Sequence, residues 1–169
     1  MIVRPERRDD LDAVIEVERA AFGTPKEPAI VEAVRDEPGS FALVAEEGGD
    51  VIGHVQLSTA RVGEDEVLAL GPIGVMPAHQ GQGIGTTLVA EALATARERG
   101  AAAVILLGAP GYYGPRGFEP AATYGLANPF AGVTEGGFVI AEEDFQLAVL
   151  DRDRVARLTG EVRWHPAFG

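Results

Sequence analysis

A glycine-rich loop joins a predicted β-strand to the clearest predicted helix of the chain. The strand segment VLALGPIGVMP covers residues 67–77, and the loop QGQGIG follows at residues 80–85. The segment 85–100 then has apolar residues at helical spacing, namely Leu88, Val89, Ala92, Leu93 and Ala96. A strand, a tight loop and an amphipathic helix in direct succession favour an α/β domain whose helices cover a sheet.

Segments on both sides of this loop complete a mixed α/β pattern. Helical spacing marks two segments before it, and alternating or apolar runs mark the strands. We predict helices at 9–22 and 29–37, and strands at 2–5, 40–47, 51–62, 67–77, 101–108 and 145–150. The turns that join the segments 40–47, 51–62 and 67–77 are short, so those three strands should pair antiparallel. The pattern predicts a mixed, mostly antiparallel sheet of about six to seven strands flanked by helices.

Length and composition limit what the chain can do. Its 169 residues fit a single domain spanning 1–169. There is no cysteine, which excludes disulfides and thiolate metal sites. The opening MIVRPERRDD lacks the apolar core of a signal peptide, and no apolar run approaches the roughly 20 residues of a membrane span. These features predict a cytoplasmic protein that does not bind a membrane.

Charge indicates the kind of partner to expect. The formal net charge is −12, the sequence pI is about 4.6, and Lys26 is the only lysine. An acidic chain without a basic cluster is a poor partner for nucleic acid. It would attract a cationic substrate instead. The oligomeric state expected is a monomer or a homodimer.

The loop chemistry favours a bound phosphate group. A Walker loop has lysine after its last glycine, but here Thr86 and Thr87 follow Gly85. The dinucleotide fingerprint places a third glycine five residues after Gly81, where Thr86 stands. Glycines still allow a ligand to approach the backbone, and a helix N-terminus attracts an anion. A pyrophosphate held by backbone amides is therefore predicted, with a ligand-free turn as the alternative.

Two motifs resemble the GCN5-related N-acetyltransferase (GNAT) family. VMPAHQGQGIG is similar to motif A of that family, V-x-P-x-x-(Q/R)-x-x-G-x-(G/A), and YYGPRGFEP is similar to motif B, in which a Tyr precedes the Phe of a Gly-Phe pair by five residues. The matching residues are Val75, Pro77, Gln80, Gly83 and Gly85 in motif A, and Tyr113, Gly117 and Phe118 in motif B. The core motifs would then span 66–120 and the C-terminal strands 121–169. The closing GEVRWHPAF resembles the YhbS-like branch.

This resemblance implies how the donor, acetyl-CoA, would bind. In the family the sheet splays open beside the fourth strand, and the pantetheine arm bonds to the strand backbone, which corresponds to Ile73, Gly74 and Val75. An amide near Ile73 or Gly74 would polarise the thioester carbonyl. The pyrophosphate would lie on amides of the loop and helix start, which correspond to Gln80, Gly81, Gln82, Gly83, Ile84, Gly85 and Thr86.

The resemblance also implies acetyl transfer to the primary amine of a small molecule by direct attack on the thioester. Tyr113 matches the general acid that protonates the departing thiolate, and a phenol with a pKa near ~10 carries the needed proton at neutral pH. Tyr112 would form a pocket wall. Gly108 and Ala109 stand where the family has Asn, so one side-chain contact to the cofactor or to a catalytic water is missing or relocated.

The general base is open at the level of sequence. Glu27 in the loop after the first helix is the candidate that we name, and a water chain is an alternative. Glu64 and Glu66 flank the turn before the cofactor strand. His54 lies on a strand, where a histidine is more often a hydrogen-bonded structural residue.

Other chemistries find little support. His79 and His165 have no second ligand at metal-binding spacing, so no metal is expected. The serine-hydrolase motif G-x-S-x-G is absent. Four residues of the C-terminal third could line an acceptor pocket or simply pack there: Tyr124, Asn128, Phe130 and Trp164. Three functional alternatives stay open: a non-catalytic acyl-CoA-binding sensor, a protein N-acetyltransferase and a nucleotide-binding α/β protein.

Overall fold

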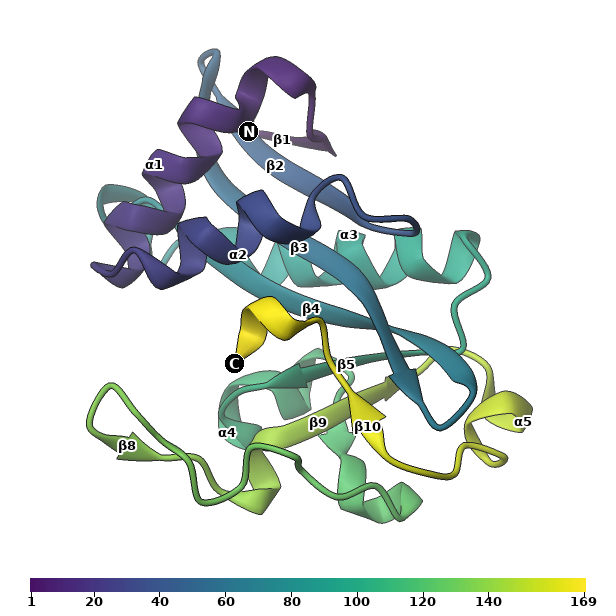
Figure 1. The fold of residues 1–169 in the computed structure, drawn as a ribbon. Coiled ribbons are helices and arrows are strands. Elements are labelled where there is room, and N and C mark those ends of the chain that lie inside the picture. Colours follow the sequence, from purple (N-terminus) through teal and green to yellow (C-terminus); the bar gives the residue numbers. More distant parts are fainter. The chain divides into compact units, whose positions relative to one another are not determined.

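A computed structural model describes all 169 residues, and they form two compact units. The N-terminal unit comprises Met1–Thr59, Leu70–Thr95 and His165–Gly169, and the C-terminal unit comprises Ala60–Ala69 and Ala96–Trp164. Three elements contribute residues to both units: β3 (Asp50–Val62), β4 (Asp65–Val75) and α3 (Ile84–Glu98) (Figure 1). Each unit has its own arrangement of strands and helices.

The strands of the N-terminal unit are antiparallel. β1 (Ile2–Pro5) pairs with β2 (Phe41–Glu47), and β2 pairs with β3 in a register that places Leu43 opposite Val55. A bulge at Ala45/Glu46 shifts this register near the turn. All of these strands were predicted within about two residues of their observed ends.

Two helices accompany these strands, α1 (Leu11–Phe22) and α2 (Lys26–Val34) (Figure 1). Val14, Val31 and Val44 form a buried cluster that joins the two helices to β2. The predicted start of α2 at residue 29 is wrong by three residues. Pro28 lies in the first turn of α2, where proline is tolerated because its missing N–H would have no intrahelical partner. Short 3₁₀ turns complete the unit: η1 (Arg8–Asp10), η2 (Pro77–His79) and η6 (Pro166–Phe168).

An ion pair fixes β1 to the start of α1. Arg4 donates to both oxygens of Asp10, at 2.7 and 2.9 Å, and Asp10 Oδ2 also accepts from the Arg7 amide at 2.7 Å. The Arg4 hydrogen bond is the main reason why the pKa of Asp10 falls to about 2. Asp10 is therefore a buried carboxylate whose charge is stabilised by its partners.

The C-terminal unit contains a parallel pair of strands. β5 (Ala103–Leu107) lies parallel to β4, with Leu68 opposite Val104 and Ala69 opposite Ile105. On its other side β5 pairs antiparallel with β9 (Phe145–Val149), which also pairs with β6 (Glu119–Pro120). Apolar side chains of these strands form a core that includes Ile105, Phe145 and Leu147.

Hydrogen bonding links eight strands in the order β1-β2-β3-β4-β5-β9-β6, with β10 (Val162–Arg163) on β3. The prediction of a mixed, mostly antiparallel sheet is confirmed, although it expected six to seven strands. The additional strands β6 and β10 have two residues each, which is too short for a period-2 pattern to be seen.

The remaining elements are short. They are α4 (Pro110–Tyr113), η3 (Gly114–Arg116), η4 (Ala121–Tyr124), the hairpin of β7 (Thr134–Glu135) and β8 (Phe138–Val139), η5 (Glu142–Asp144) and α5 (Arg152–Val155). Among the described helices, none is long and apolar enough to cross a bilayer.

Candidate active site

The predicted phosphate loop has the backbone shape that its glycines suggested. β4 ends at Val75, and α3 begins at Ile84. Gly81 and Gly83 lie between them with φ angles of 75° and 83°, in the left-handed region that favours glycine. A Cβ atom added to either residue would meet no atom within 4 Å. The loop therefore presents bare backbone to open space.

Two glutamine side chains hold this loop in shape. Gln80 Nε2 donates to the Val75 carbonyl at 3.0 Å, and Gln82 Nε2 donates to the Ala78 carbonyl at 3.4 Å. The first backbone hydrogen bond at this end of α3 runs from the Thr87 amide to the Gly83 carbonyl at 3.0 Å. The first amides of an α-helix generally have no carbonyl of the same helix one turn earlier, so the N-terminus of α3 carries the positive end of the helix dipole. This geometry suits an anion.

The backbone before the loop belongs to the N-terminal unit. Gly74 is buried, while Ile73 and Val75 are half-buried. The Met76 amide bonds to the Ile52 carbonyl of β3 at 2.9 Å and fixes the end of β4. Gly74 has no side chain, and this allows α1 to approach the strand closely.

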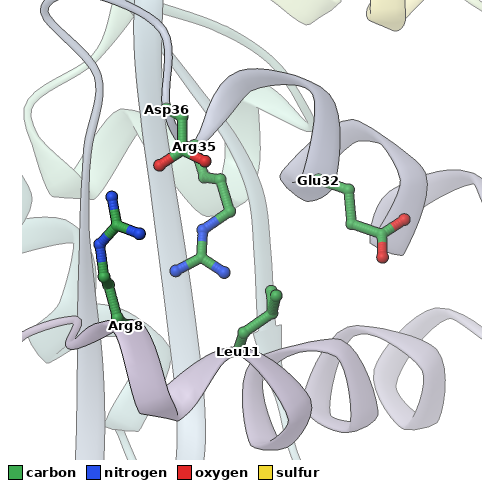
Figure 2. A pocket seen from close by; sticks show the side chains of 5 residues that line it. All are labelled: Arg8, Leu11, Glu32, Arg35 and Asp36. Atoms are coloured by element: carbon green, nitrogen blue, oxygen red, sulfur yellow. The ribbon is translucent and has the colours of Figure 1, made fainter.

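A buried cluster of ionisable side chains lies in this unit, and the sequence analysis named His54 but not Glu18 or Glu6. Glu18 of α1 and His54 of β3 are fully buried, and Glu18 Oε1 lies 2.6 Å from His54 Nδ1. His54 Nε2 lies 3.8 Å from Glu6 Oε2. Glu6 Oε1 in turn forms an ion pair with Arg35 at 2.8 Å, without the alignment of a hydrogen bond. Arg35 also lines a hollow of about 310 Å³ on this unit, together with Arg8, Leu11, Glu32 and Asp36 (Figure 2).

Glu18 directs its second oxygen at the cofactor strand. Glu18 Oε2 has no hydrogen-bond partner, and a Cβ atom added to Gly74 would lie 2.8 Å from it. Burial raises the pKa of the Glu18 carboxyl, the neighbouring Glu27 charge also raises it, and the hydrogen bond from His54 lowers it. One signal in the sequence could have found this residue: Glu18 follows Leu11 and Val14 at helical spacing, on the apolar face of α1.

The other carboxylates considered for the base lie elsewhere. Glu27 is on the first turn of α2, half-buried, and its carboxylate accepts a hydrogen bond from the Thr24 hydroxyl. Glu64 is exposed in the turn between β3 and β4, and Glu66 is exposed at the start of β4, both in the C-terminal unit. His54 is a hydrogen-bonded buried residue, as histidines on strands commonly are.

Tyr113 is the predicted acid, and it lies in the C-terminal unit at the end of α4. Its ring makes edge contacts with Tyr112 and Phe118, at centroid distances of 4.8 and 5.7 Å. Burial raises the pKa of the Tyr113 phenol to about 12, so the phenol is protonated at neutral pH. Tyr112 is 40% exposed and carries the Arg116 guanidinium 3.6 Å above its ring.

Gly108 explains why no asparagine follows β5. A Cβ atom at Gly108 would lie 2.2 Å from Tyr113 Cε2, so any side chain here would displace the tyrosine ring. The backbone of Gly108 is fixed on both sides: its amide donates to the Asp144 carbonyl at 2.8 Å, and its carbonyl accepts from Gln146 at 3.1 Å. The absence of a side chain at Gly108 therefore leaves room for the Tyr113 ring.

Four residues considered for an acceptor pocket have packing and turn roles in the C-terminal unit. Trp164 packs against Phe130 and against the core residue Phe145. Asn128 bonds to the Ala141 carbonyl and accepts from the Phe130 amide, which closes a turn. Tyr124 donates to Glu119.

Comparison with known proteins identifies the class. Residues 11–118 match the profile of the Acetyltransferase (GNAT) family. The chain is 33% identical to "Uncharacterized N-acetyltransferase YhbS" of Escherichia coli K12 over 172 aligned positions, which cover 99% of this chain and 98% of that protein. The chain therefore belongs to the GNAT family and is a GNAT N-acetyltransferase with the fold that the two motifs indicated.

Solved structures agree with this assignment. The crystal structure of E. coli YhbS in complex with CoA has a TM-score of 0.86 and 31% identity, covering 99% of this chain and 91% of that one. A GNAT acetyltransferase from Brucella melitensis in complex with acetyl-CoA has a TM-score of 0.76 and 32% identity, with coverages of 99% and 97%. Acetyl-CoA is accordingly the donor of the family to which this chain belongs.

Proposed function

We propose that the chain transfers an acetyl group from acetyl-CoA to the primary amine of a small molecule, by direct attack of the amine on the thioester. The observation that supports binding of acetyl-CoA, the acetyl donor, is the shape of the loop. Gly81 and Gly83 leave open space directly before α3. In this proposal the amides from Gln80 to Thr86 hold the pyrophosphate. The backbone from Ile73 to Val75 holds the pantetheine arm and polarises the thioester carbonyl.

The acceptor in this proposal is a cationic amine. The net charge of −12 attracts an ammonium ion to the protein. Two carboxylates of the N-terminal unit, Glu18 and Glu27, are close enough that the charge of Glu27 raises the pKa of Glu18. Such a pair disfavours a second anion and favours a cation beside it. The absence of cysteine fits a reducing compartment, and we place the reaction in the cytoplasm.

The leaving group needs a proton, and we assign its delivery to Tyr113. The phenol with a pKa of about 12 keeps its proton at neutral pH and can give it to the CoA thiolate as the C–S bond breaks. The amine must lose a proton to attack. The sequence suggested Glu27 for this step, and the hydrogen bond from Thr24 shows that its carboxylate already has one partner.

A thiol-release assay with a panel of amines tests the proposal. The panel contains monoamines, polyamines, amino sugars and short peptides with free N-termini. We expect acetyl-CoA to be consumed with at least one small cationic amine and not with the peptides. Thermal shift measured in parallel with acetyl-CoA, ATP and NAD should show stabilisation by acetyl-CoA. Stabilisation without CoA release from any amine would indicate a binding protein, and turnover of peptides alone would indicate a protein N-acetyltransferase.

A further inference from the structure

The strand β9 contains one fully buried polar side chain. Gln146 has 0% exposed surface, and the other residues of this strand are all apolar: Phe145, Leu147, Ala148 and Val149. The carboxamide oxygen of Gln146, Oε1, is buried without a hydrogen-bond partner. A buried polar atom without a partner weakens the fold, so an apolar residue would suit this position better. The hydrogen bond made by the nitrogen of the same amide is therefore the feature to explain.

The amide nitrogen of Gln146 binds the backbone directly after β5. Its Nε2 atom donates to the Gly108 carbonyl at 3.1 Å. Figure 1 shows β5 beside β9, with α4 following β5. The chain leaves the sheet at Gly108, because β5 ends at Leu107 and α4 begins at Pro110. The Gln146 side chain thus holds the junction between the last residue of the strand and the helix that carries Tyr113.

The backbone of the sheet does not supply this hydrogen bond. The register of β5 and β9, continued by one residue, places Gly108 opposite Asp144. In an antiparallel hydrogen-bonded pair, two opposite residues exchange both N–H···O bonds. Here the Gly108 amide donates to the Asp144 carbonyl at 2.8 Å, but the Asp144 amide donates to the Ala141 carbonyl at 3.2 Å. The Gln146 side chain therefore replaces the donor that the Asp144 backbone does not provide.

The peptide group that Gln146 binds is also the starting point of α4. The next carbonyl along the chain, that of Ala109, accepts from the amides of Tyr112 at 3.0 Å and Tyr113 at 3.1 Å. The Tyr113 ring lies directly against Gly108, since a Cβ atom added there would be 2.2 Å from Tyr113 Cε2. A shift of the peptide between Gly108 and Ala109 would therefore move the Tyr113 ring.

We propose that Gln146 is a positioning residue of the acetyl transfer, which fixes the peptide between Gly108 and Ala109 and through it the phenol of Tyr113. This inference rests on the proposed function, in which Tyr113 protonates the departing CoA thiolate. Gln146 is fully enclosed, so it acts through the backbone beside Tyr113 and not by contact with the reacting atoms. A proton donor must lie within hydrogen-bond reach of its acceptor. A small displacement of the phenol should then slow the reaction without weakening the binding of acetyl-CoA.

A second buried glutamine provides a matched control. Gln56 of β3 also has 0% exposed surface and an Oε1 atom without a partner. Its Nε2 atom donates to two backbone carbonyls, those of Phe41 at 3.1 Å and Leu57 at 3.0 Å. Gln56 belongs to the N-terminal unit, whereas Gln146 and Tyr113 belong to the C-terminal unit. The two glutamines therefore share burial and backbone bonding, but only Gln146 is bonded to the peptide that precedes α4.

The test replaces each glutamine by methionine, an unbranched side chain of similar length without an N–H donor. The single-turnover rate of CoA release is measured at saturating acetyl-CoA with an amine that the screen identifies as an acceptor. We expect Gln146→Met to lower this rate about 10-fold and to change the dissociation constant for acetyl-CoA less than about threefold. Gln56→Met should keep the rate within about twofold of the wild type, because its site is not coupled to the phenol.

Combination with Tyr113→Phe separates a positioning role from a purely structural one. If Gln146 acts through the phenol, its loss has no further effect once the phenol is gone. The double variant Tyr113→Phe/Gln146→Met should then release CoA as slowly as Tyr113→Phe alone. A general disturbance of the C-terminal unit would multiply the two losses instead. The effects of Gln56→Met and Tyr113→Phe should multiply, since the two sites are independent.

A second variant serves if Gln146→Met does not fold. Gln146→Asn keeps an amide in the core, but it is one methylene shorter and so moves the donor away from the Gly108 carbonyl. The same slowing, and the same lack of further loss when it is combined with Tyr113→Phe, are expected.

The possible failures are distinguishable. A wild-type rate in the folded Gln146 variant, a loss that multiplies with that of Tyr113→Phe, or equal slowing in Gln56→Met would overturn the role of Gln146 and leave the proposed function intact. A wild-type rate in Tyr113→Phe would overturn the assignment of the acid, and the role of Gln146 with it. Failure of the wild type to release CoA with any amine would overturn the proposed function itself.

Discussion

The glycine loop and the Glu18–His54 cluster are two regions of the N-terminal unit that handle charge in opposite ways. The loop presents no charged side chain between Gln80 and Thr86 and leads directly into the N-terminus of α3. The cluster instead buries the Glu18 carboxylate and the His54 imidazole completely. A fixed anion such as pyrophosphate needs only dipoles of fixed direction, whereas a buried carboxylate needs a partner that compensates its charge. The two regions can be tested by mutating one at a time, with ligand affinity as the measurement for the loop and stability as the measurement for the cluster.

The largest effect is expected in the loop. Gly83→Val forces a β-branched residue into the left-handed region and fills the open space before α3, so acetyl-CoA affinity should fall at least about 100-fold. Gly100→Val is a matched control at the other end of α3, because Gly100 has a φ of 78° and equally open surroundings. Both variants carry the same strain, but only the first should lose the ligand in isothermal calorimetry. Similar affinities in the two folded variants would contradict the assignment of the pyrophosphate to this loop.

The second prediction concerns a residue that should affect proton transfer but not the binding of acetyl-CoA. Tyr113→Phe removes the phenol proton but keeps the ring against Phe118, so we expect turnover to fall about 100-fold while the affinity for acetyl-CoA stays within about threefold. Tyr112→Phe is the control, because Tyr112 is the adjacent and more exposed tyrosine. Steady-state kinetics of CoA release measures both variants. Normal turnover in Tyr113→Phe would remove the phenol from the mechanism.

The contrast between the glycine loop and the Glu18–His54 cluster also explains which features could be predicted from the sequence. The loop, the strand before it and the helix after it are contiguous, so local glycine and apolar spacing determined all three, and the family motif covers the same residues. The cluster is assembled from residues 6, 18, 35 and 54, which four different segments contribute. Nothing local connects these positions. Only the pairing of β2 with β3 and the packing of α1 bring them together.

Some local signals were present in the sequence, but their structural meaning was not identified. Glu18 lies on the apolar face of α1, and a charged residue on such a face signals a buried partner elsewhere. The second helix was predicted to begin at residue 29, directly after Pro28, although proline is well tolerated in the first turn, where the structure places it. Gly108 was interpreted as a lost contact, whereas its missing side chain makes room for Tyr113.

A smaller effect on turnover is expected from substitution of Gly108. Gly108→Ala places a methyl group in the position of the Tyr113 ring and should displace the phenol, so we expect a loss of about 10-fold in turnover and about 1–3 kcal/mol in the free energy of unfolding. Gly111→Ala is the control, because a Cβ atom there meets nothing within 4 Å. Kinetics and chemical denaturation of both variants measure the difference. Equal behaviour of the two would mean that the position of the Tyr113 ring does not matter to the reaction.

The last prediction compares two buried carboxylates of the N-terminal unit, and it concerns the free energy of unfolding rather than turnover. Arg4 holds the pKa of Asp10 near about 2, below its usual 3.8, whereas burial raises the pKa of Glu18 above 4.5. The folded state therefore binds fewer protons at Asp10 than the unfolded state does, and more at Glu18. The Asp10 pair contributes stability that is present above pH 3.8 and is lost as the pH falls towards 2, while the ionisation of Glu18 opposes folding increasingly as the pH rises above 4.5.

Asp10→Asn should accordingly lower the free energy of unfolding by about 2 kcal/mol at pH 7, and the difference from the wild type should shrink between pH 4 and pH 2. Glu18→Gln should act in the opposite direction, since it removes a term that weakens the fold as the pH rises; its stability should fall less than that of the wild type between pH 5 and pH 8. Urea denaturation at several pH values measures both slopes. Parallel slopes for the two variants would contradict the opposite directions in which the fold shifts the pKa values of Asp10 and Glu18.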